Sequence, residues 1–199
     1  MPMKLQIGRQ DIASALRTEI VAAETIPPLF DQPAIEAPKY LGKLSRVFNR
    51  PRANDFRKGA AAQIDDGNGD PTFAELIVAD RLRGSGWDCV WYSAFGNKKI
   101  KSWPWDAPEP QTGEIPQYVC KVLTKVSVAR QELTGANKAT FHGIPDVIAW
   151  RQDDLVMIEC KHAKHDRLRS DQAEWFQCAK ITGLSVTQFG IYEWKFREP

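Results

Sequence analysis

The chain has 199 residues, of which 43% are hydrophobic and 26% are charged, and its formal net charge at pH 7 is +2. This length is sufficient for one globular domain with a substantial core and an extension. The chain has no apolar run of about 18 residues and no apolar block near its first residue, so we expect neither a transmembrane helix nor a signal peptide. Because the net charge is small, any surface for a polyanion must be a local one.

The cysteines give no sign of a disulfide or zinc framework. The chain has four of them, Cys89, Cys120, Cys160 and Cys178, and no two have the Cys-x-x-Cys spacing. Each lies in an apolar segment, which favours buried, reduced thiols. We therefore expect a cytoplasmic protein.

Residues 1–70 are expected to form an N-terminal extension. The stretch DIASALRTEIVAAE (11–24) predicts a helix, and the proline-punctuated sequence from residue 27 onward predicts irregular structure as far as the turn signal DDGNGDP (65–71). Between residues 39 and 58 there are seven Lys or Arg and one acidic residue. This basic segment is either a nucleic-acid contact or a solvated arm, and the sequence leaves both readings open.

From residue 71 onward the elements alternate in type. A helix is expected over 72–84 with Thr72 as its N-cap, followed by a strand over 87–95 (WDCVWYSAF). An insertion over 96–140 contains a proline-rich loop and a helix within 117–133. Two strands, 146–150 and 155–161, are joined by the hairpin turn RQDD. A helix over 170–183, capped by Ser170 or Asp171, and a strand over 185–194 complete the set.

The order of these elements, α-β-(insertion)-β-β-α-β, predicts an α/β domain over residues 71–199. Its sheet is mixed and carries helices on its faces.

Charged residues lie at the margins of the two central strands. Asp146 opens the first strand, and Glu159 and Lys161 are near the end of the second, on one face because alternate strand residues share a face. In an antiparallel hairpin Asp146 lies beside Glu159. Two adjacent carboxylates raise each other's pKa unless a cation lies between them, and oxygen ligands suit Mg²⁺ or Mn²⁺. With Lys161 to orient water or stabilise charge on a phosphate, the arrangement suits metal-assisted phosphodiester hydrolysis.

These residues also carry a family resemblance. Pro145-Asp146 followed by Glu159-Cys160-Lys161 resembles the PD-(D/E)XK nuclease signature, and GIPD…IECK…DQAEW resembles the virus-type replication-repair nuclease (VRR-NUC) branch. The resemblance covers residues 143–191 well and 72–94 more loosely. It implies a restriction-endonuclease-like core and divalent-metal-dependent cleavage of nucleic acid, with DNA as the expected substrate. It also implies that Asp146, Glu159 and the backbone carbonyl of Cys160 hold the metal, while Lys161 serves the attacking water.

Two further residues have both a structural and a functional reading. Glu75 follows Thr72 by three residues, which is the spacing of a capping box. In the resembling family, a glutamate on this helix often helps to hold the metal or a metal-bound water. Gln172 is either a solvated amide in a first helical turn or, as the resemblance implies, a side chain that points into the site towards Lys161 or the phosphate.

Basic residues suggest where nucleic acid binds. Lys98, Lys99 and Lys101 stand beside two tryptophans, which suits phosphate contact with base stacking but also suits a plain surface loop. Lys164, Arg167 and Arg169 directly follow the second central strand, which favours contacts with the phosphate backbone.

Two other functions remain open. One is a catalytically inactive relative that binds nucleic acid, and the other is a small-molecule metal-dependent hydrolase. The sequence also leaves open whether DNA or RNA is the substrate, which strand structure is cut, and whether two copies of the chain pair as a homodimer.

Overall fold

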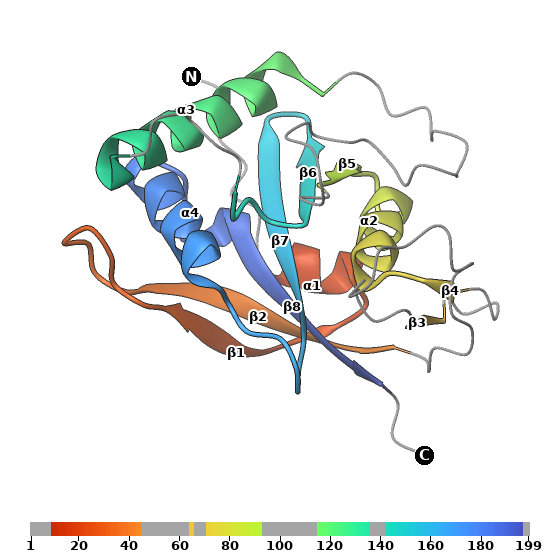
Figure 1. The fold of residues 1–199 in the computed structure, drawn as a ribbon. Coiled ribbons are helices and arrows are strands. Elements are labelled where there is room, and N and C mark those ends of the chain that lie inside the picture. The colour runs from red at the N-terminus through yellow and green to blue at the C-terminus, as the bar shows by residue number, and fades with distance from the viewer. Residues whose placement is uncertain (1–8, 45–63, 66–70, 93–114, 136–141, 197–199) are drawn as a thin grey trace, which may run out of the picture.

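The computed structural model describes residues 9–44, 64–65, 71–92, 115–135 and 142–196, and its core is one mixed sheet with helices on both faces (Figure 1). The six strands of this sheet, in spatial order, are β1 (Glu19–Ile26), β2 (Ile35–Leu44), β8 (Phe189–Phe196), β7 (Asp154–His162), β6 (Val147–Arg151) and β5 (Asp88–Trp91). The helices are α1 (Arg9–Ala15), α2 (Ala74–Gly84), α3 (Gln117–Thr134) and α4 (Ser170–Ile181), and a short 3-10 helix, η1 (Val186–Gln188), precedes β8. A separate two-stranded pair consists of β3 (Ile64–Asp65) and β4 (Pro71–Thr72). The predicted α/β class, with a mixed sheet and flanking helices, is confirmed.

The central hairpin has the predicted antiparallel register. Val147 pairs with Ile158 and Arg151 pairs with Asp154, so that only two residues form the turn between β6 and β7. In that turn Gln152 has a φ of 56°, a left-handed conformation that a tight hairpin turn requires. This register brings Asp146, which precedes β6, beside Glu159 of β7.

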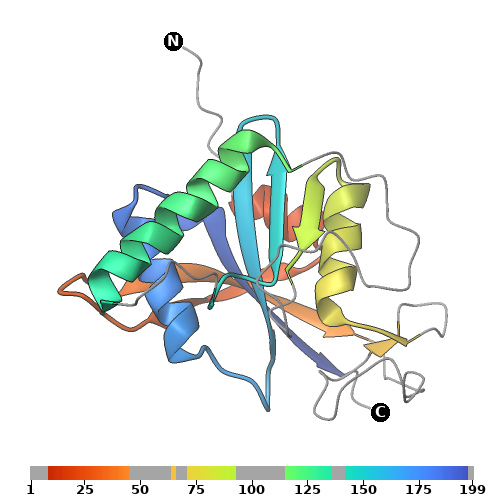
Figure 2. The same ribbon diagram turned by 45° about the horizontal axis from the view of Figure 1, so that its top comes forward.

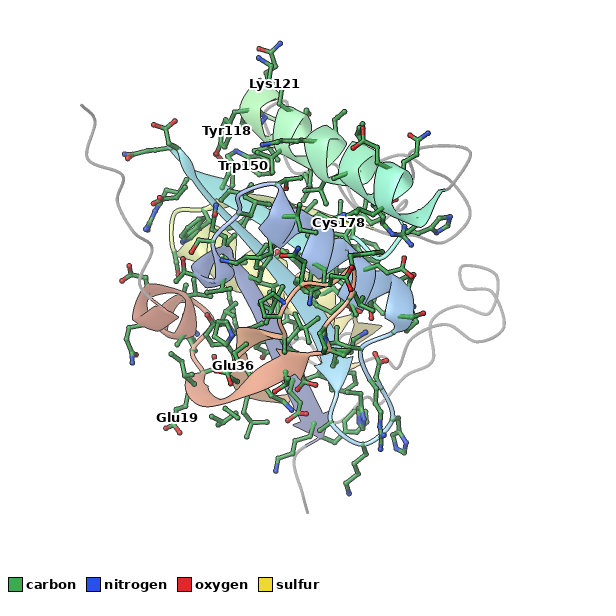
Figure 3. All side chains as sticks on the ribbon, turned by 90° about the vertical axis from the view of Figure 1, so that its left-hand side faces the viewer. Glu19, Glu36, Tyr118, Lys121, Trp150 and Cys178 are labelled. Atoms are coloured by element: carbon green, nitrogen blue, oxygen red, sulfur yellow. The ribbon has the colours of Figure 1, made fainter. Side chains whose placement is uncertain are left out.

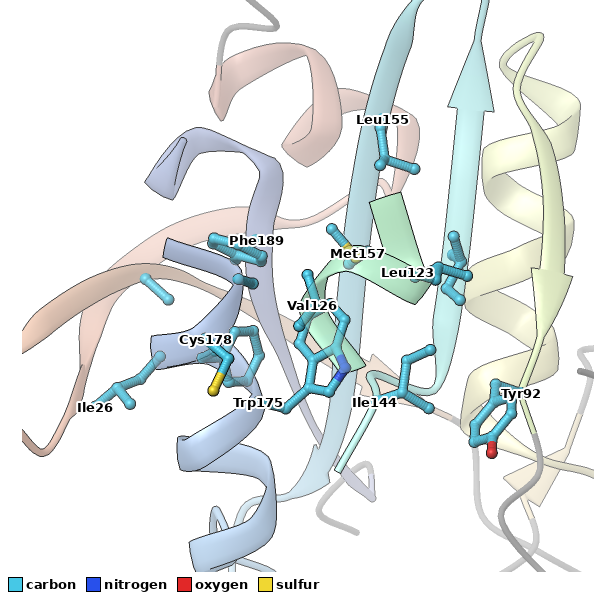
Figure 4. Close-up of a cluster of buried hydrophobic side chains, with 14 of the residues drawn as sticks. Ile26, Tyr92, Leu123, Val126, Ile144, Leu155, Met157, Trp175, Cys178 and Phe189 are labelled. Atoms are coloured by element: carbon cyan, nitrogen blue, oxygen red, sulfur yellow. The ribbon is translucent and has the colours of Figure 1, made fainter. Parts of the chain in front are cut away.

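The two faces of the sheet are covered by different helices. On one face α1 and α2 pack on alternate side chains of β6 and β7, including Ala149, Val156 and Cys160. On the other face α3 and α4 pack on the intervening residues, including Ile148 and Met157. Figure 4 shows this second core, and Figure 2 shows α3 and α4 together on their side of the sheet. Neighbouring residues of one strand thus serve two cores, and Glu159 and Lys161 share the face of α3 and α4.

The N-terminal residues belong to the same sheet. Strand β2 runs parallel to β8, with Tyr40 opposite Tyr192. Gly42 makes room for the ring of Tyr192, since a Cβ there would lie 2.0 Å from the tyrosine hydroxyl oxygen. Figure 3 shows α3, α4 and the β1–β2 hairpin one below another on this side of the molecule.

Several sequence predictions for the N-terminal region and the helix caps are therefore wrong. The helix expected over 11–24 ends at Ala15, and β1 begins at Glu19. The segment expected to be irregular contains β2, so residues 19–44 share a sheet with the residues after 71. The N-cap of α2 is Phe73 and not Thr72, and the N-cap of α4 is Arg169. Most of the basic segment over 39–58 lies outside the described residues.

The other predicted elements have counterparts in the structure. The helix expected within 117–133 is α3, and the two central strands, the helix after them and the last strand are β6, β7, α4 and β8. The four cysteines are free, and all but the exposed Cys120 are buried. No helix in the described part of the chain is both long and apolar enough to cross a membrane.

Candidate active site

Asp146, Glu159 and Lys161 come together at the end of the β6–β7 hairpin. The Nζ atom of Lys161 lies 2.7 Å from Oε1 of Glu159, and the two side chains are only 7% and 1% exposed. Oδ2 of Asp146 accepts a hydrogen bond of 2.9 Å from the backbone N–H of Cys160. The Cys160 side chain lies in the core on the opposite face, as strand alternation requires. The predicted neighbourhood of the two carboxylates and the ammonium is therefore present.

Gln172 is bound directly to Glu159. Its side chain is 2% exposed, and its amide nitrogen donates a short hydrogen bond to Oε1 of Glu159. The amide oxygen accepts from the backbone N–H of Arg169 at 3.0 Å, which fixes the orientation of the amide. Gln172 is thus not a solvated amide, and its partner within the site is Glu159.

The second carboxylate oxygen of Glu159 is an exception among buried polar atoms. Oε2 is buried and has no hydrogen-bond partner among the residues that the structure describes. A buried carboxylate oxygen without a partner is costly, and either a bound cation or a proton shared with the nearby carboxyl group of Asp146 removes that cost.

Glu75 lies in the first turn of α2 and does not form the expected capping box. Phe73 is the N-cap, and it makes no side-chain capping hydrogen bond, so the Thr72–Glu75 pair does not cap this helix. The Glu75 carboxyl is half-buried. Burial, followed by the negative charge of Asp146, raises the pKa of Glu75 to about 8, although Lys161 acts in the opposite direction. Glu75 therefore belongs electrostatically to the site.

The pKa values of the two carboxyl groups at the hairpin end are also raised. Burial raises the pKa of Asp146, against the effect of the Cys160 N–H. Burial and the charge of Asp146 raise the pKa of Glu159 well above its usual range. Burial lowers the pKa of Lys161, but Glu159 and Asp146 outweigh it and leave that pKa raised. One ammonium thus lies among the carboxyl groups of Asp146, Glu159, Glu75 and Asp166, and in the absence of another cation burial favours protons on the first three.

The residues present fit a small divalent cation with oxygen ligands. Asp146 and Glu159 supply carboxylates, and the unpartnered Oε2 supplies a free ligand atom. The N–H and C=O of a strand residue point to the same lateral side, so the carbonyl of Cys160 points to the side on which its N–H meets Asp146. No group of three or more His, Cys, Asp or Glu side chains within the described ranges is arranged to hold a metal ion. The candidate ligand set is therefore two carboxylates and one carbonyl, completed by water as Mg²⁺ commonly is.

Asp166 is a site residue that sequence reasoning missed. It lies in the turn between β7 and α4, with Oδ2 3.5 Å from Nζ of Lys161 and its side chain 47% exposed. Lys161 is thus held between Glu159 and Asp166. The available signal was one acidic residue within the otherwise basic segment KHAKHDRLR.

Arg130 of α3 is a second residue that the sequence did not indicate. Its Nε and Nη2 atoms donate to Oε2 of Glu174 on α4 at 3.1 and 2.7 Å, and its Nη1 donates to the carbonyl of His142 at 2.9 Å. The arginine therefore connects α3, α4 and the segment that leads to Asp146. No local pattern announces a contact between residues so far apart in the chain.

The same segment makes a close backbone contact with the first turn of α4. Gly143 has a φ of +77°, and a Cβ at this position would lie 2.0 Å from the carbonyl oxygen of Asp171. Asp171 directly precedes Gln172. The approach of the two backbones thus fixes Asp146 and Gln172 relative to each other.

The predicted nucleic-acid contacts are only partly within the described residues. Lys164, Arg167 and Arg169 are exposed on the turn over 163–169, beside the hairpin end. Arg169 also donates to Asp171 at 3.1 Å. Lys98, Lys99 and Lys101 lie outside the described residues.

Comparison of the chain with family models, with curated proteins and with solved structures gives no match. The chemistry of the residues at the hairpin end is therefore the basis for assigning a function.

Proposed function

We propose that the chain is a divalent-metal-dependent nuclease that hydrolyses phosphodiester bonds, with DNA as its substrate and a restriction-endonuclease-like core. The observation that carries this proposal is the cluster of Asp146, Glu159 and Lys161 at one hairpin end, where a buried carboxylate oxygen has no partner among the described residues. The resemblance of the same residues to the PD-(D/E)XK signature supports it.

In this proposal Asp146, Glu159 and the carbonyl of Cys160 hold Mg²⁺ or Mn²⁺. When bound, the ion would polarise a phosphate oxygen and lower the pKa of a water ligand. The raised pKa values of Asp146 and Glu159 mean that these groups release protons when a cation is bound, because only their ionised forms are good ligands.

The other residues orient and protect this arrangement. Gln172 fixes the rotamer of Glu159 through its amide, and burial of the pair keeps competing water away. Lys161 places a positive charge 2.7 Å from Glu159, where it donates to the attacking water or to the negative charge that develops on the phosphate. Glu75 adds a carboxyl group on the α2 side, and its pKa of about 8 leaves it mostly protonated at neutral pH in the metal-free chain. Its ionised form, which a bound cation would favour, can accept a proton from that water.

Nucleic acid is the proposed substrate because the basic turn lies beside the site. Lys164, Arg167 and Arg169 are exposed between β7 and α4, and Asp166 of the same turn reaches Lys161. Exposed Lys and Arg side chains bind phosphates with a strong dependence on salt. A hydrolase of small molecules would not require several exposed basic side chains on a turn beside its active site.

The test is to incubate the purified chain with labelled single- and double-stranded DNA and RNA, in Mg²⁺, in Mn²⁺ and in a chelator. We expect metal-dependent cleavage of DNA by the parent and none by Asp146→Asn, which keeps the size of the side chain. Binding without cleavage in either metal would instead support the inactive relative. If the chain neither binds nor cuts nucleic acid, the proposal is wrong, and phosphate esters of small molecules become the substrates to test.

A further inference from the structure

Four aromatic side chains gather at the rim of the sheet where β7 and β8 end. They are His162, His165, Trp194 and Phe196, and we call them the rim aromatic cluster. The rings of His162 and His165 stack with centroids 4.8 Å apart, and the His162 ring meets Trp194 edge-on at 4.5 Å. Phe196 lies 5.7 Å from His162 and 5.5 Å from Trp194. The cluster therefore forms a continuous set of ring contacts that ends at His165.

His165 is the exposed member of the cluster, while His162 and Trp194 are buried to 9% and 5% exposure. The backbone of the turn holds His165 in place, since its N–H donates to the carbonyl of His162 at 3.2 Å. The next N–H, of Asp166, donates to the same carbonyl at 3.0 Å. An exposed imidazole is thus stacked on a supported ring, which reduces the entropy that a further stacking partner would have to overcome.

The His162 imidazole is neutral in this arrangement. Its Nδ1 accepts a hydrogen bond of 3.2 Å from the backbone N–H of Lys164, so the ring proton is on Nε2. The stack consequently does not place two imidazolium charges face to face.

The cluster is next to both the basic turn and the candidate active site. Lys164 precedes His165, Arg167 follows it by two residues, and both are exposed. Asp166, the neighbour of His165, has its carboxylate 3.5 Å from the ammonium of Lys161. Lys161 and His162 point to opposite faces of β7, so a strand with a phosphate near Lys161 must cross the end of β7, along the basic turn, to place a base on His165.

We propose that the rim aromatic cluster is a nucleobase-stacking site, at which an unpaired base lies on His165 while its flanking phosphates contact Lys164 and Arg167. The inference rests on the proposed function and narrows its substrate class to strands with unpaired nucleotides beside the cleaved bond. A base in a duplex is already stacked on both faces and cannot lie on a protein ring, whereas every unpaired base has a free face.

The test distinguishes binding through stacked bases from binding through phosphates. Binding of the chain is measured in a chelator, so that nothing is cut, to an oligothymidylate of about 12 nucleotides and to a fully abasic strand of the same length, which suit the usual site sizes. Removal of all bases makes the comparison independent of the register in which the strand binds. The variants are His165→Ala, His165→Phe, Lys164→Ala and, as a matched control, His142→Ala, which removes another exposed histidine.

We expect His165→Ala to weaken binding of the oligothymidylate about fivefold, as for loss of one stacked base, and to leave binding of the abasic strand unchanged. His165→Phe should restore the loss. Lys164→Ala should weaken both strands by the same factor, and His142→Ala should weaken neither. Thermal unfolding of each variant shows whether the turn is intact.

Four results would overturn the inference. Equal effects of His165→Ala on the two strands would mean that His165 acts by charge alone, and no effect on either would mean that it makes no contact. Binding of duplex DNA with no binding of the single strand would reject this site while leaving the nuclease proposal standing. If the parent binds no nucleic acid of any kind, both proposals fail together.

Discussion

The ammonium of Lys161 lies 2.7 Å from Oε1 of Glu159, whereas Asp146, the other proposed carboxylate ligand, accepts its hydrogen bond from the backbone N–H of Cys160. The two carboxylates therefore differ in how much the folded chain depends on them. In the absence of metal, Glu159 is the carboxyl group closest to the buried ammonium, while ionised Asp146 adds negative charge to an already acidic site.

The isosteric variants Glu159→Gln and Asp146→Asn should accordingly differ in stability. Glu159→Gln weakens the closest hydrogen bond to the buried Lys161 ammonium, which keeps Asp166 and the charge of Asp146 nearby, so it should destabilise the metal-free chain by about 2 kcal/mol. Asp146→Asn keeps an oxygen that can accept from the Cys160 N–H and removes the repulsion between Asp146 and Glu159, so it should change the free energy of unfolding by less than about 1 kcal/mol. Urea unfolding at pH 7 in a chelator measures both. Equal losses in the two variants would contradict the asymmetry.

The stability of the metal-free chain should fall between pH 7 and 9. Glu75 has a pKa raised to about 8 in the folded chain, against 4.5 for an unperturbed glutamate, so in this range the folded state holds more protons than the unfolded state. Stability then decreases as pH rises through the folded pKa, by on the order of 1 kcal/mol for one carboxyl group. Buried thiols act in the same direction, and the difference between the parent and Glu75→Gln isolates the carboxyl. A Glu75→Gln variant with the same pH slope as the parent would refute the assignment.

Removal of the Lys161 ammonium should separate metal binding from turnover. In Lys161→Met the proposed ligands Asp146, Glu159 and the Cys160 carbonyl remain, so Mg²⁺ or Mn²⁺ affinity measured by calorimetry should be kept. Cleavage should fall by roughly a hundredfold or more, because the charge that meets the water or the phosphate is lost. If metal affinity collapses as well, Lys161 organises the ligands rather than the reaction. A turnover close to that of the parent would remove it from the mechanism.

Arg130 should affect the site through position alone. The variant Arg130→Met breaks the links to Glu174 and to the carbonyl of His142, and should lower metal affinity by about tenfold, as is typical for residues that support metal ligands. Lys125→Met is the matched control, because Lys125 ties the same two helices together at the far end of α4, with Nζ 2.8 Å from the carbonyl of Thr182. Both variants should lose some stability, and only Arg130→Met should lose metal affinity. Equal metal affinities in variants of equal stability would make the arginine purely structural.

Two glycines in left-handed conformations test the close backbone contact between Gly143 and Asp171, which fixes the position of Asp146. Gly135 has a φ of +67° with open space around it, so Gly135→Ala should destabilise by about 1 kcal/mol through backbone strain alone. Gly143→Ala adds a collision with the carbonyl oxygen of Asp171, and should cost at least about 2 kcal/mol more than Gly135→Ala. If the two variants unfold at the same denaturant concentration, the backbones near Gly143 can separate without penalty.

The central hairpin and α4 could be predicted because their signals are local. Two short apolar runs flank the turn RQDD and predict two strands. The short turn allows one antiparallel register, so Asp146 and Glu159 had to be neighbours. Because successive side chains of a strand point to opposite faces, Lys161 was expected in the site and Cys160 in the core behind it. Gln172 was recognised from its place in the sequence, but its bond to Glu159 depends on how α4 docks, which no local pattern determines.

The N-terminal strands could not be predicted because their stability comes from distant pairing. The segment EIVAAETI of β1 mixes helix formers (Glu and Ala) with β-branched residues, so its local preference is weak, and its strand conformation depends on β2, which in turn pairs with β8. Tertiary pairing overrides such weak local preferences. Thr72 likewise satisfied the rule for a helix N-cap, but it lies in β4, where it pairs with Ile64 of β3. Arg130 acts across the fold and carries no motif of its own.

The position of β8 has a consequence for synthesis of the chain on the ribosome. This strand lies inside the sheet, between β2 and β7, yet it comes last in sequence among the strands that the structure describes. The β1–β2 hairpin therefore emerges early, and about 145 further residues are added before β8 is made. At ordinary rates of translation the β8-facing edge of β2 stays unpaired for roughly ten seconds or longer. An open strand edge is a site for pairing with other chains. Nascent chains stalled before residue 189 should consequently depend on chaperones far more than the completed protein does.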